Sequence, residues 1–275
     1  MRTEQPVEIR RSDYAPPAYA VDEVRLRFDL APGATRVNAA LDLRPWAADG
    51  PGAQEPPPLR LDGEDLKLHR IAIDGAALSA DAYAVDAEGL TVHAPPAGRF
   101  TLETDVEIAP EKNTRLEGLY LSNGVYCTQC EAEGFRRITY YPDRPDVMAA
   151  FEVEIRGDAR KQPVLLSNGD LVESGALDDG RHFARWRDPH RKPSYLFALV
   201  AGDLAKTADS FTTRSGAHVD LAIWTEHGQE AKTLYAMDAL KRSMKWDEEV
   251  YGLEYDLGQF NIVAISDFNM GAMEN

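Results

Sequence analysis

The sequence has only two cysteines, Cys127 and Cys130, among its 275 residues. Two cysteines cannot supply the several disulfides that hold small secreted domains together, and a chain of this length buries enough apolar surface to fold without them. Free cysteines are typical of a reducing compartment. At about 150 residues a domain, the length predicts about two domains.

Long apolar runs are also missing. No stretch reaches the roughly 18 consecutive apolar residues that span a bilayer. Residues 1–30 carry Asp13, Asp22, Glu23 and Asp29 and lack the apolar centre of a signal peptide. We therefore expect a soluble, cytoplasmic protein that is not inserted in a membrane.

Basic residues are scarce relative to acidic ones. Lys and Arg number 30 against 46 Asp and Glu, which gives a formal net charge of −16 and a pI near 4.8. Nucleic acid and anionic membranes both require clustered cations on their partner, so neither is expected to bind. A ligand that carries a positive charge would instead be attracted.

Alternation of apolar and polar residues dominates the chain up to about residue 203. Residues 24–30 and 37–43 alternate around a Pro-Gly turn, which predicts a hairpin with one buried face. Further strands are predicted at residues 66–73, 90–92, 100–108 and 151–155, in a hairpin around Asn168 and Gly169, and in the apolar run 195–200. The Pro- and Gly-rich residues 44–58 predict a loop. Strands without a helical period between them favour a sandwich-like or saddle-like β domain.

Residues 204–275 follow a different pattern. A strand-like run at 219–224 precedes a helical pattern with Leu234, Met237, Leu240 and Met244 on one face. Residues 260–265 are apolar throughout, which predicts a strand buried on both faces. Strand, helix and strand are the opening of an α/β or α+β unit. We therefore predict a mainly β fold with two domains, residues 1–203 and 204–275.

The pair Cys127 and Cys130 forms a C-x-x-C motif that three kinds of site could use. A structural zinc site needs four ligands, but there is no second C-x-x-C and the six histidines show no i, i+4 pairing. A thioredoxin-like redox motif would open a helix, whereas residues 118–126 look extended. We favour structural packing, and we keep a redox role and metal binding as alternatives.

Most common catalytic motifs are missing. The sequence contains no H-E-x-x-H, no G-x-S-x-G, no P-loop and no dinucleotide fingerprint. His182 and His190 stand among arginines, in a segment for which a solvated hairpin is the favoured interpretation. Composition and spacing alone do not assign a reaction.

A five-residue motif follows the predicted strand of residues 260–265. Residues 271–275 read Gly-Ala-Met-Glu-Asn. A chance match to five fixed residues in a chain of this length has a probability on the order of one in ten thousand at average residue frequencies. This is the GAMEN signature, and through it the sequence resembles the aminopeptidase N family of zinc metallopeptidases.

Other stretches carry the same resemblance and are similar to the bacterial-type branch of that family. They are residues 116–120, 126–131, 134–137 and 141–146. The resemblance runs from about Tyr14 to Asn275 and is weakest between residues 45 and 58. It implies an N-terminal β-sandwich or saddle domain, followed by the first part of a thermolysin-like α+β catalytic domain that ends at the motif.

The resemblance implies a site that recognises a free α-amino group. Glu274 and Glu131 would supply two carboxylates for the ammonium, with Gln129 beside them as a polar wall. Two close carboxylates repel each other, and a bound ammonium relieves that repulsion, so the pair selects charged amines. A fixed carboxylate also sets the distance from the amine to the first carbonyl group of a peptide.

The residues around Glu274 have further implied roles. Met270 would form a flexible apolar wall for the first side chain of the substrate. Gly271 and Ala272 would let the backbone pair with the peptide. The full set of implied substrate-binding residues is Gln129, Glu131, Met270, Gly271, Ala272, Met273, Glu274 and Asn275.

The hydrolytic groups of the family do not occur in these 275 residues. In the family, an H-E-x-x-H helix with a later glutamate binds zinc and supplies the general base, and a tyrosine steadies the oxyanion. We therefore predict no metal ligand and no catalytic residue in this chain, with zinc in the full-length parent. The chain alone is expected to be inactive; its partners would be peptides with a free N-terminal amine and the rest of its own catalytic domain.

Two interpretations from other classes remain. The chain could be a self-sufficient β-sandwich binding module whose last strand merely ends in a familiar motif. It could also be a redox protein that uses Cys127 and Cys130. Protection of the tail against proteolysis would favour the first, and acidic thiols would favour the second.

Overall fold

The computed structural model describes residues 10–46, 56–268 and 270–275. Within these ranges the chain forms eighteen strands, one α-helix and five short 3-10 helices, so the predicted mainly β class is confirmed. Most of the predicted loop at residues 44–58 lies outside the described residues. No helix among the described residues is long and apolar enough to cross a membrane.

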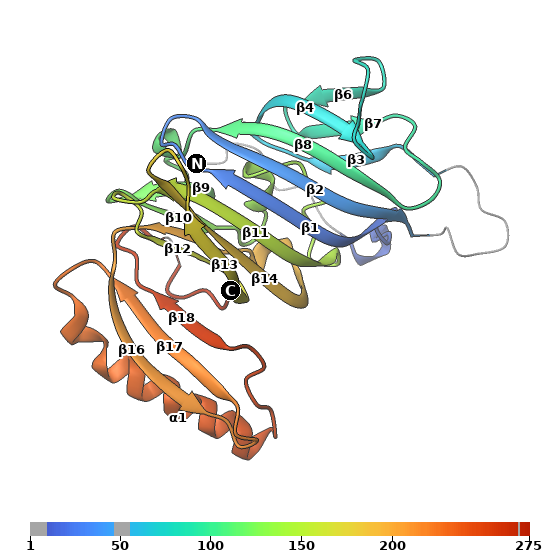
Figure 1. Ribbon diagram of the computed structural model, residues 1–275. Coiled ribbons are helices and arrows are strands. Elements are labelled where there is room, and N and C mark those ends of the chain that lie inside the picture. The colour runs from blue at the N-terminus through green and yellow to red at the C-terminus, as the bar shows by residue number, and fades with distance from the viewer. Residues whose placement is uncertain (1–9, 47–55, 269) are drawn as a thin grey trace.

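The largest sheet has eight strands and forms the curved layer across the upper part of Figure 1. In spatial order its strands are β13 (Asp170–Ala176), β14 (Arg181–Pro193), β11 (Met148–Asp158), β1 (Tyr19–Asp29), β2 (Thr35–Pro45), β8 (Phe100–Ile108), β4 (Lys67–Ile73) and β5 (Ala76–Ala77). The predicted hairpin of residues 24–30 and 37–43 is the antiparallel pair β1 and β2. β1 also pairs with β11 in parallel, across more than a hundred residues of sequence.

Two smaller sheets share one hydrophobic core with the large sheet. They are β12 (Val164–Ser167), β15 (Leu199–Gly202), β10 (Val125–Gln129) and β9 (Gly118–Ser122), and β3 (Leu59–Asp62), β7 (Gly89–Val92) and β6 (Tyr83–Asp86). Phe135 lies near the centre of this core, with its ring 5.2 Å from that of Phe197 and 6.0 Å from that of Phe151. Offset and edge-on aromatic pairs of this kind stabilise a core beyond the area that they bury.

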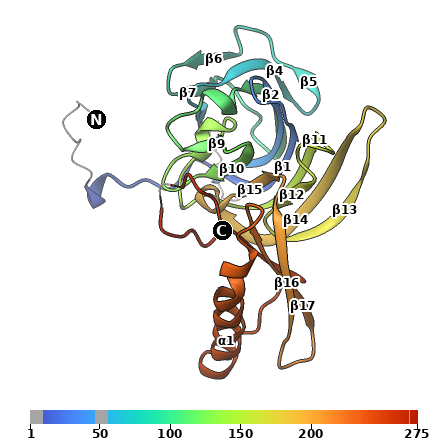
Figure 2. The same cartoon turned by 90° about the vertical axis from the view of Figure 1, so that its left-hand side faces the viewer.

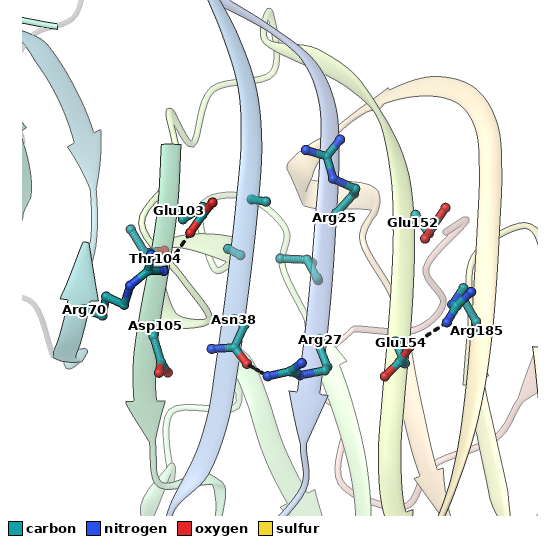
Figure 3. A pocket seen from close by; sticks show the side chains of 13 residues that line it. Arg25, Arg27, Asn38, Arg70, Glu103, Thr104, Asp105, Glu152, Glu154 and Arg185 are labelled. Atoms are coloured by element: carbon teal, nitrogen blue, oxygen red, sulfur yellow. Dashed lines mark hydrogen bonds and ion pairs between the residues drawn. The ribbon is translucent and has the colours of Figure 1, made fainter. Parts of the chain in front are cut away.

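The outer face of the large sheet is polar because every second residue of its strands points away from the core. Figure 3 shows this face, where opposite charges on neighbouring strands pair with each other. Arg185 Nη2 donates to Glu154 Oε2 over 3.0 Å, and Arg70 Nη1 donates to Glu103 Oε2 over 2.6 Å. A cavity of about 410 Å³ on this face is lined largely by such paired charges.

Three further strands and the α-helix form a second unit at the lower left of Figure 1. β16 (Ala205–Thr212), β17 (His218–Thr225) and β18 (Gln259–Val263) form one sheet, and α1 (Leu234–Val250) connects the parallel pair β17 and β18. Met237 and Met244 of α1 are buried with Val219, Leu221 and Ile223 in a separate small core. The predicted strand, helix and strand are therefore present.

Two predicted strand features are wrong. Residues around Asn168 and Gly169 do not form a hairpin, because β12 pairs with β15 whereas β13 pairs with β14 in another sheet. The apolar run 195–200 is only partly strand, since a 3-10 helix occupies Ser194–Leu196 before β15 begins at Leu199. Periodicity identifies extended residues but does not identify their partners.

The prediction that the strand at residues 260–265 is buried on both faces is also wrong. β18 is half-buried along its whole length and pairs only with β17 among the described strands. The edge of β18 that does not pair with β17 lies beside a cavity that β18 helps to line. The predicted hairpin around His182 and His190 is present as β13 and β14.

Candidate substrate-binding site

The motif residues line a cavity between the three-sheet body and the second unit. Figure 2 shows the end of the chain passing below β9 and β10, between the body and the β16–β18 sheet. The cavity has a volume of about 680 Å³, larger than the charged one on the outer face of the large sheet. Its walls come from the ends of β10, β12 and β15, from β18 and from residues 270–275.

The side chains of residues 270–275 are mostly open to this cavity and to solvent. Met270 is 39% exposed, and Glu274 is exposed as well. A Cβ atom placed on Gly271 would meet no other atom within 4 Å, so packing within the described chain does not require glycine there. Asn275 Nδ2 donates to the carbonyl oxygen of Leu196 over 3.3 Å, which ties the end of the segment to the body.

Gln129 is the last residue of β10 and is only 1% exposed. Both its side-chain oxygen and its side-chain nitrogen are buried, and neither has a hydrogen-bond partner within the described part of the chain. A buried amide without partners costs on the order of 1–3 kcal/mol, so such groups in native proteins usually serve a ligand or an ordered water. The amide of Gln129 therefore has free hydrogen-bonding capacity toward a further polar group, within the described part of the chain.

Glu131 lies in the turn that follows β10, and its side chain is exposed. This turn is closed by a hydrogen bond of 2.8 Å from the Gly134 amide to the Cys130 carbonyl oxygen. A Cβ atom on Gly134 would lie only 2.6 Å from the Gln129 carbonyl oxygen and 3.0 Å from the Gly118 nitrogen. Gly134 thus allows the close approach that holds Glu131 next to the end of β10.

The structure brings together six of the eight predicted binding residues. Residues 270–275 line the cavity, and Cys127 and Thr128 of β10 line it as well. Gln129 and Glu131 do not line it; Gln129 directly follows Thr128 in the chain, and Glu131 comes two residues later. The prediction that Glu131 and Glu274 share one ammonium stays a prediction.

The cavity also has polar walls that the sequence did not predict. Asp188 lines it, and its Oδ2 accepts a hydrogen bond of 2.7 Å from Lys192 Nζ. Burial lowers the pKa of Lys192, although the carboxylate of Asp188 opposes this shift. Tyr255 is another wall residue, and burial raises its pKa to about 12. Asp188 and Tyr255 belong to no sequence motif, and Asp188 is one polar residue in an arginine-rich strand. No pattern in the sequence therefore indicated that they line the cavity.

Cys127 and Cys130 are both buried, and neither forms a disulfide. Burial raises the pKa of the Cys127 thiol to about 11 and that of Cys130 well above its usual range. A thiol in its protonated form is a poor nucleophile and a poor metal ligand. The two cysteines are therefore suited to packing and not to redox chemistry.

Residues 10–46, 56–268 and 270–275 contain no group of three or more His, Cys, Asp or Glu side chains that could hold a metal ion. The described residues therefore do not fit a zinc ion. We derive no chemical step through a metal from them.

The fold and the site together describe a β body joined to the start of an α+β unit, with a cavity between the two. The chain matches the Peptidase M1 N-terminal domain over residues 54–196 and the Peptidase family M1 domain over residues 235–275. The chain belongs to peptidase family M1.

Individual relatives agree with this assignment. The chain is 56% identical to aminopeptidase N of Caulobacter vibrioides and 50% identical to aminopeptidase N of Escherichia coli, over 100% and 99% of its length. It spans only 31% and 30% of the length of those proteins. The crystal structure of Legionella pneumophila aminopeptidase A in complex with aspartic acid superposes with a TM-score of 0.88 at 34% identity, covering 94% of this chain and 30% of that one.

Proposed function

We propose that this chain is the N-terminal portion of a zinc aminopeptidase that removes single residues from the N-termini of peptides, and that it recognises the α-amino group. The observation that carries the proposal is that the motif residues 270–275 line a cavity of about 680 Å³ beside β10 in a chain of peptidase family M1. The names of its relatives support an aminopeptidase. The solved relative was crystallised with aspartic acid, and a free amino acid is the kind of product that such an enzyme releases.

In this proposal the residues of the chain bind and orient the substrate. Glu274 and Glu131 accept hydrogen bonds from the ammonium group, and the buried amide of Gln129 contacts it or the adjoining peptide group. The backbone of Gly271 and Ala272 pairs with the peptide, for which the open space around Gly271 leaves room. Met270 contacts the first side chain, because a thioether adapts to several shapes.

The zinc and the groups that act on the scissile bond are not assigned to this chain. The family resemblance implies zinc in the complete enzyme, but the described residues provide no set of ligands for it. The 275-residue chain alone is expected not to hydrolyse aminoacyl-nitroanilides even with added zinc. A cytoplasmic location stays a prediction.

The proposal is tested by substituting Glu274→Gln in the complete protein that contains this chain. The change removes one charge-assisted hydrogen bond, which is worth about 1.5 to 3 kcal/mol, so kcat/KM for a free-amine substrate should fall roughly ten- to a hundredfold. Glu133→Gln is a matched control, because Glu133 is an exposed glutamate in the turn after β10 that has no proposed contact with the amine.

The unsubstituted protein should also discriminate strongly against the same substrate with an acetylated amine. Equal hydrolysis of the free and acetylated substrates would contradict the proposed amine recognition. Full activity of Glu274→Gln would contradict the role given to that residue.

A further inference from the structure

Two side chains of β9 hold the backbone just ahead of the motif. Ser122 Oγ donates to Asp267 Oδ2 over 2.9 Å, and the Asp267 amide donates back to Ser122 Oγ over 3.2 Å. Tyr120 Oη donates to the Asp267 carbonyl oxygen over 2.9 Å. Ser122 and Tyr120 are almost fully buried, whereas Asp267 is exposed, so these hydrogen bonds lie at the boundary between the body and solvent.

A second set of contacts lies beside the first. Glu226, just beyond β17, accepts a hydrogen bond of 3.0 Å from Asn123 Nδ2 and one of 2.7 Å from Ser266 Oγ. Asn123 belongs to the turn between β9 and β10, and Ser266 directly precedes Asp267. The tip of the β9–β10 hairpin is therefore tied to the second unit and to the approach of the motif.

The same hairpin carries the amine-binding end of β10. Ser122 pairs with Val125 at the turn, and Gly118 pairs with Gln129 at the other end of the ladder. One hairpin thus contacts Asp267 near its tip and has Gln129 at its other end, with Glu131 in the turn that follows. The motif segment, residues 270–275, starts three residues after Asp267, and Asn275 ties its other end to the Leu196 carbonyl oxygen.

We propose that Ser122, Tyr120 and Asp267 form a positioning clamp that sets the motif segment at a fixed place relative to Gln129 and Glu131. The inference rests on the proposed function, since the clamp matters for the segment that binds substrate. None of the three residues has a proposed contact with the substrate, so they act through residues 270–275. A displacement of a binding group by about 1 Å can cost up to a hundredfold in rate, so the loss of this clamp should have a measurable effect.

The first test measures hydrogen exchange in the 275-residue chain. Ser122→Ala should speed the exchange of the backbone amides at residues 264–268 by roughly fivefold or more, because Asp267 loses two of its hydrogen bonds. Thr35→Ala is the matched control: Thr35 is fully buried, and its Oγ1 donates to the Ala31 carbonyl oxygen over 2.7 Å in a distant hairpin. Unchanged exchange at Asp267 in Ser122→Ala would overturn the clamp.

The second test measures kinetics in the complete protein. Ser122→Ala and Asp267→Ala should each raise KM for a free-amine substrate about tenfold and change kcat less than twofold. The double variant should be no worse than Ser122→Ala alone, because that change already removes both hydrogen bonds between the two residues. Thr35→Ala should leave KM unchanged. An increase of KM in the double variant that equals the product of the two single increases would overturn the positioning role. So would an unchanged KM in Ser122→Ala, in Asp267→Ala and in the double variant.

The two tests separate this inference from the proposed function. If the unsubstituted complete protein does not hydrolyse aminoacyl substrates, the proposed function fails, and with it the role of the clamp in substrate binding. If the protein is active but exchange at Asp267 does not respond to Ser122→Ala, the clamp fails and the proposed function stands.

Discussion

At the scale of single residues, the buried thiols give the clearest chemical contrast with the redox interpretation. Burial raises the pKa of Cys127 to about 11, so at a given pH a smaller fraction of it is thiolate than in an unfolded chain. Thiolate is the reactive form, and an ordinary cysteine titrates at a pKa of about 8.5.

We therefore predict that alkylation of the native chain at pH 8 is at least about a hundredfold slower than alkylation of the unfolded chain. The alkylation rate of the native chain should keep rising above the pH at which the alkylation rate of an exposed thiol reaches its plateau. Mass-spectrometric counting of labelled cysteines over time would measure it. Rapid labelling of Cys127 or Cys130 in the folded chain at neutral pH would instead favour the redox interpretation.

Single residues also mark what a sequence can and cannot predict about the site. Residues 271–275 were identifiable because five fixed letters stand together. Ser122, Asp188 and Tyr255 were not, since each is an ordinary residue whose role depends on a neighbour distant in the chain. The buried amide of Gln129, which has no hydrogen-bond partner among the described residues, is likewise a property of the fold; only the family resemblance drew attention to that residue.

At the scale of elements, the turn after β10 is closely packed around Gly134. Gly134 lies against the Gln129 carbonyl oxygen and the Gly118 nitrogen, and a Cβ atom there would be too close to both. These are backbone atoms that cannot move aside independently.

Gly134→Ala is therefore predicted to destabilise the chain by about 1–3 kcal/mol, as overpacking does, and to displace Glu131. Denaturant unfolding would measure the first effect, and KM for a free-amine substrate in the complete protein the second. Gly98→Ala serves as a control, because a Cβ atom at Gly98 meets nothing within 4 Å. An unchanged stability and KM in Gly134→Ala would show that the turn does not constrain Glu131.

The elements also show why local pattern predicted some strands correctly and others not. The β1–β2 hairpin follows from alternation around a tight turn, which is local information. The parallel pairing of β1 with β11, and the division of residues 164–176 between two sheets, depend on partners far away in sequence. The apolar composition of β18 predicted full burial, but its outer edge faces the cavity and has no partner among the described strands.

At the scale of the whole molecule, the two cores differ greatly in size. The body has one extensive core that includes residues from three sheets, whereas the core of the second unit has five buried apolar residues among those described. Several large apolar side chains of α1 and the segment after it are exposed, among them Tyr235, Trp246 and Tyr251. The proposed division at residues 203 and 204 falls between these cores.

We predict that the second unit opens at lower free energy than the body, because few buried contacts oppose local unfolding. Limited proteolysis of the 275-residue chain should remove residues from the C-terminal side and leave a resistant fragment that ends near residue 203. A tail that resists the protease as well as the body does would favour the self-sufficient binding module.

The central claim is that Glu131 and Glu274, from distant parts of the sequence, bind one ammonium group together. The most direct measurement is a crystal structure of the complete protein with a bound free amino acid. We predict that its α-amino nitrogen lies at about 2.7–2.9 Å from a carboxylate oxygen of each glutamate. An amine bound by only one of them, with the other carboxylate in a separate cleft, would contradict it.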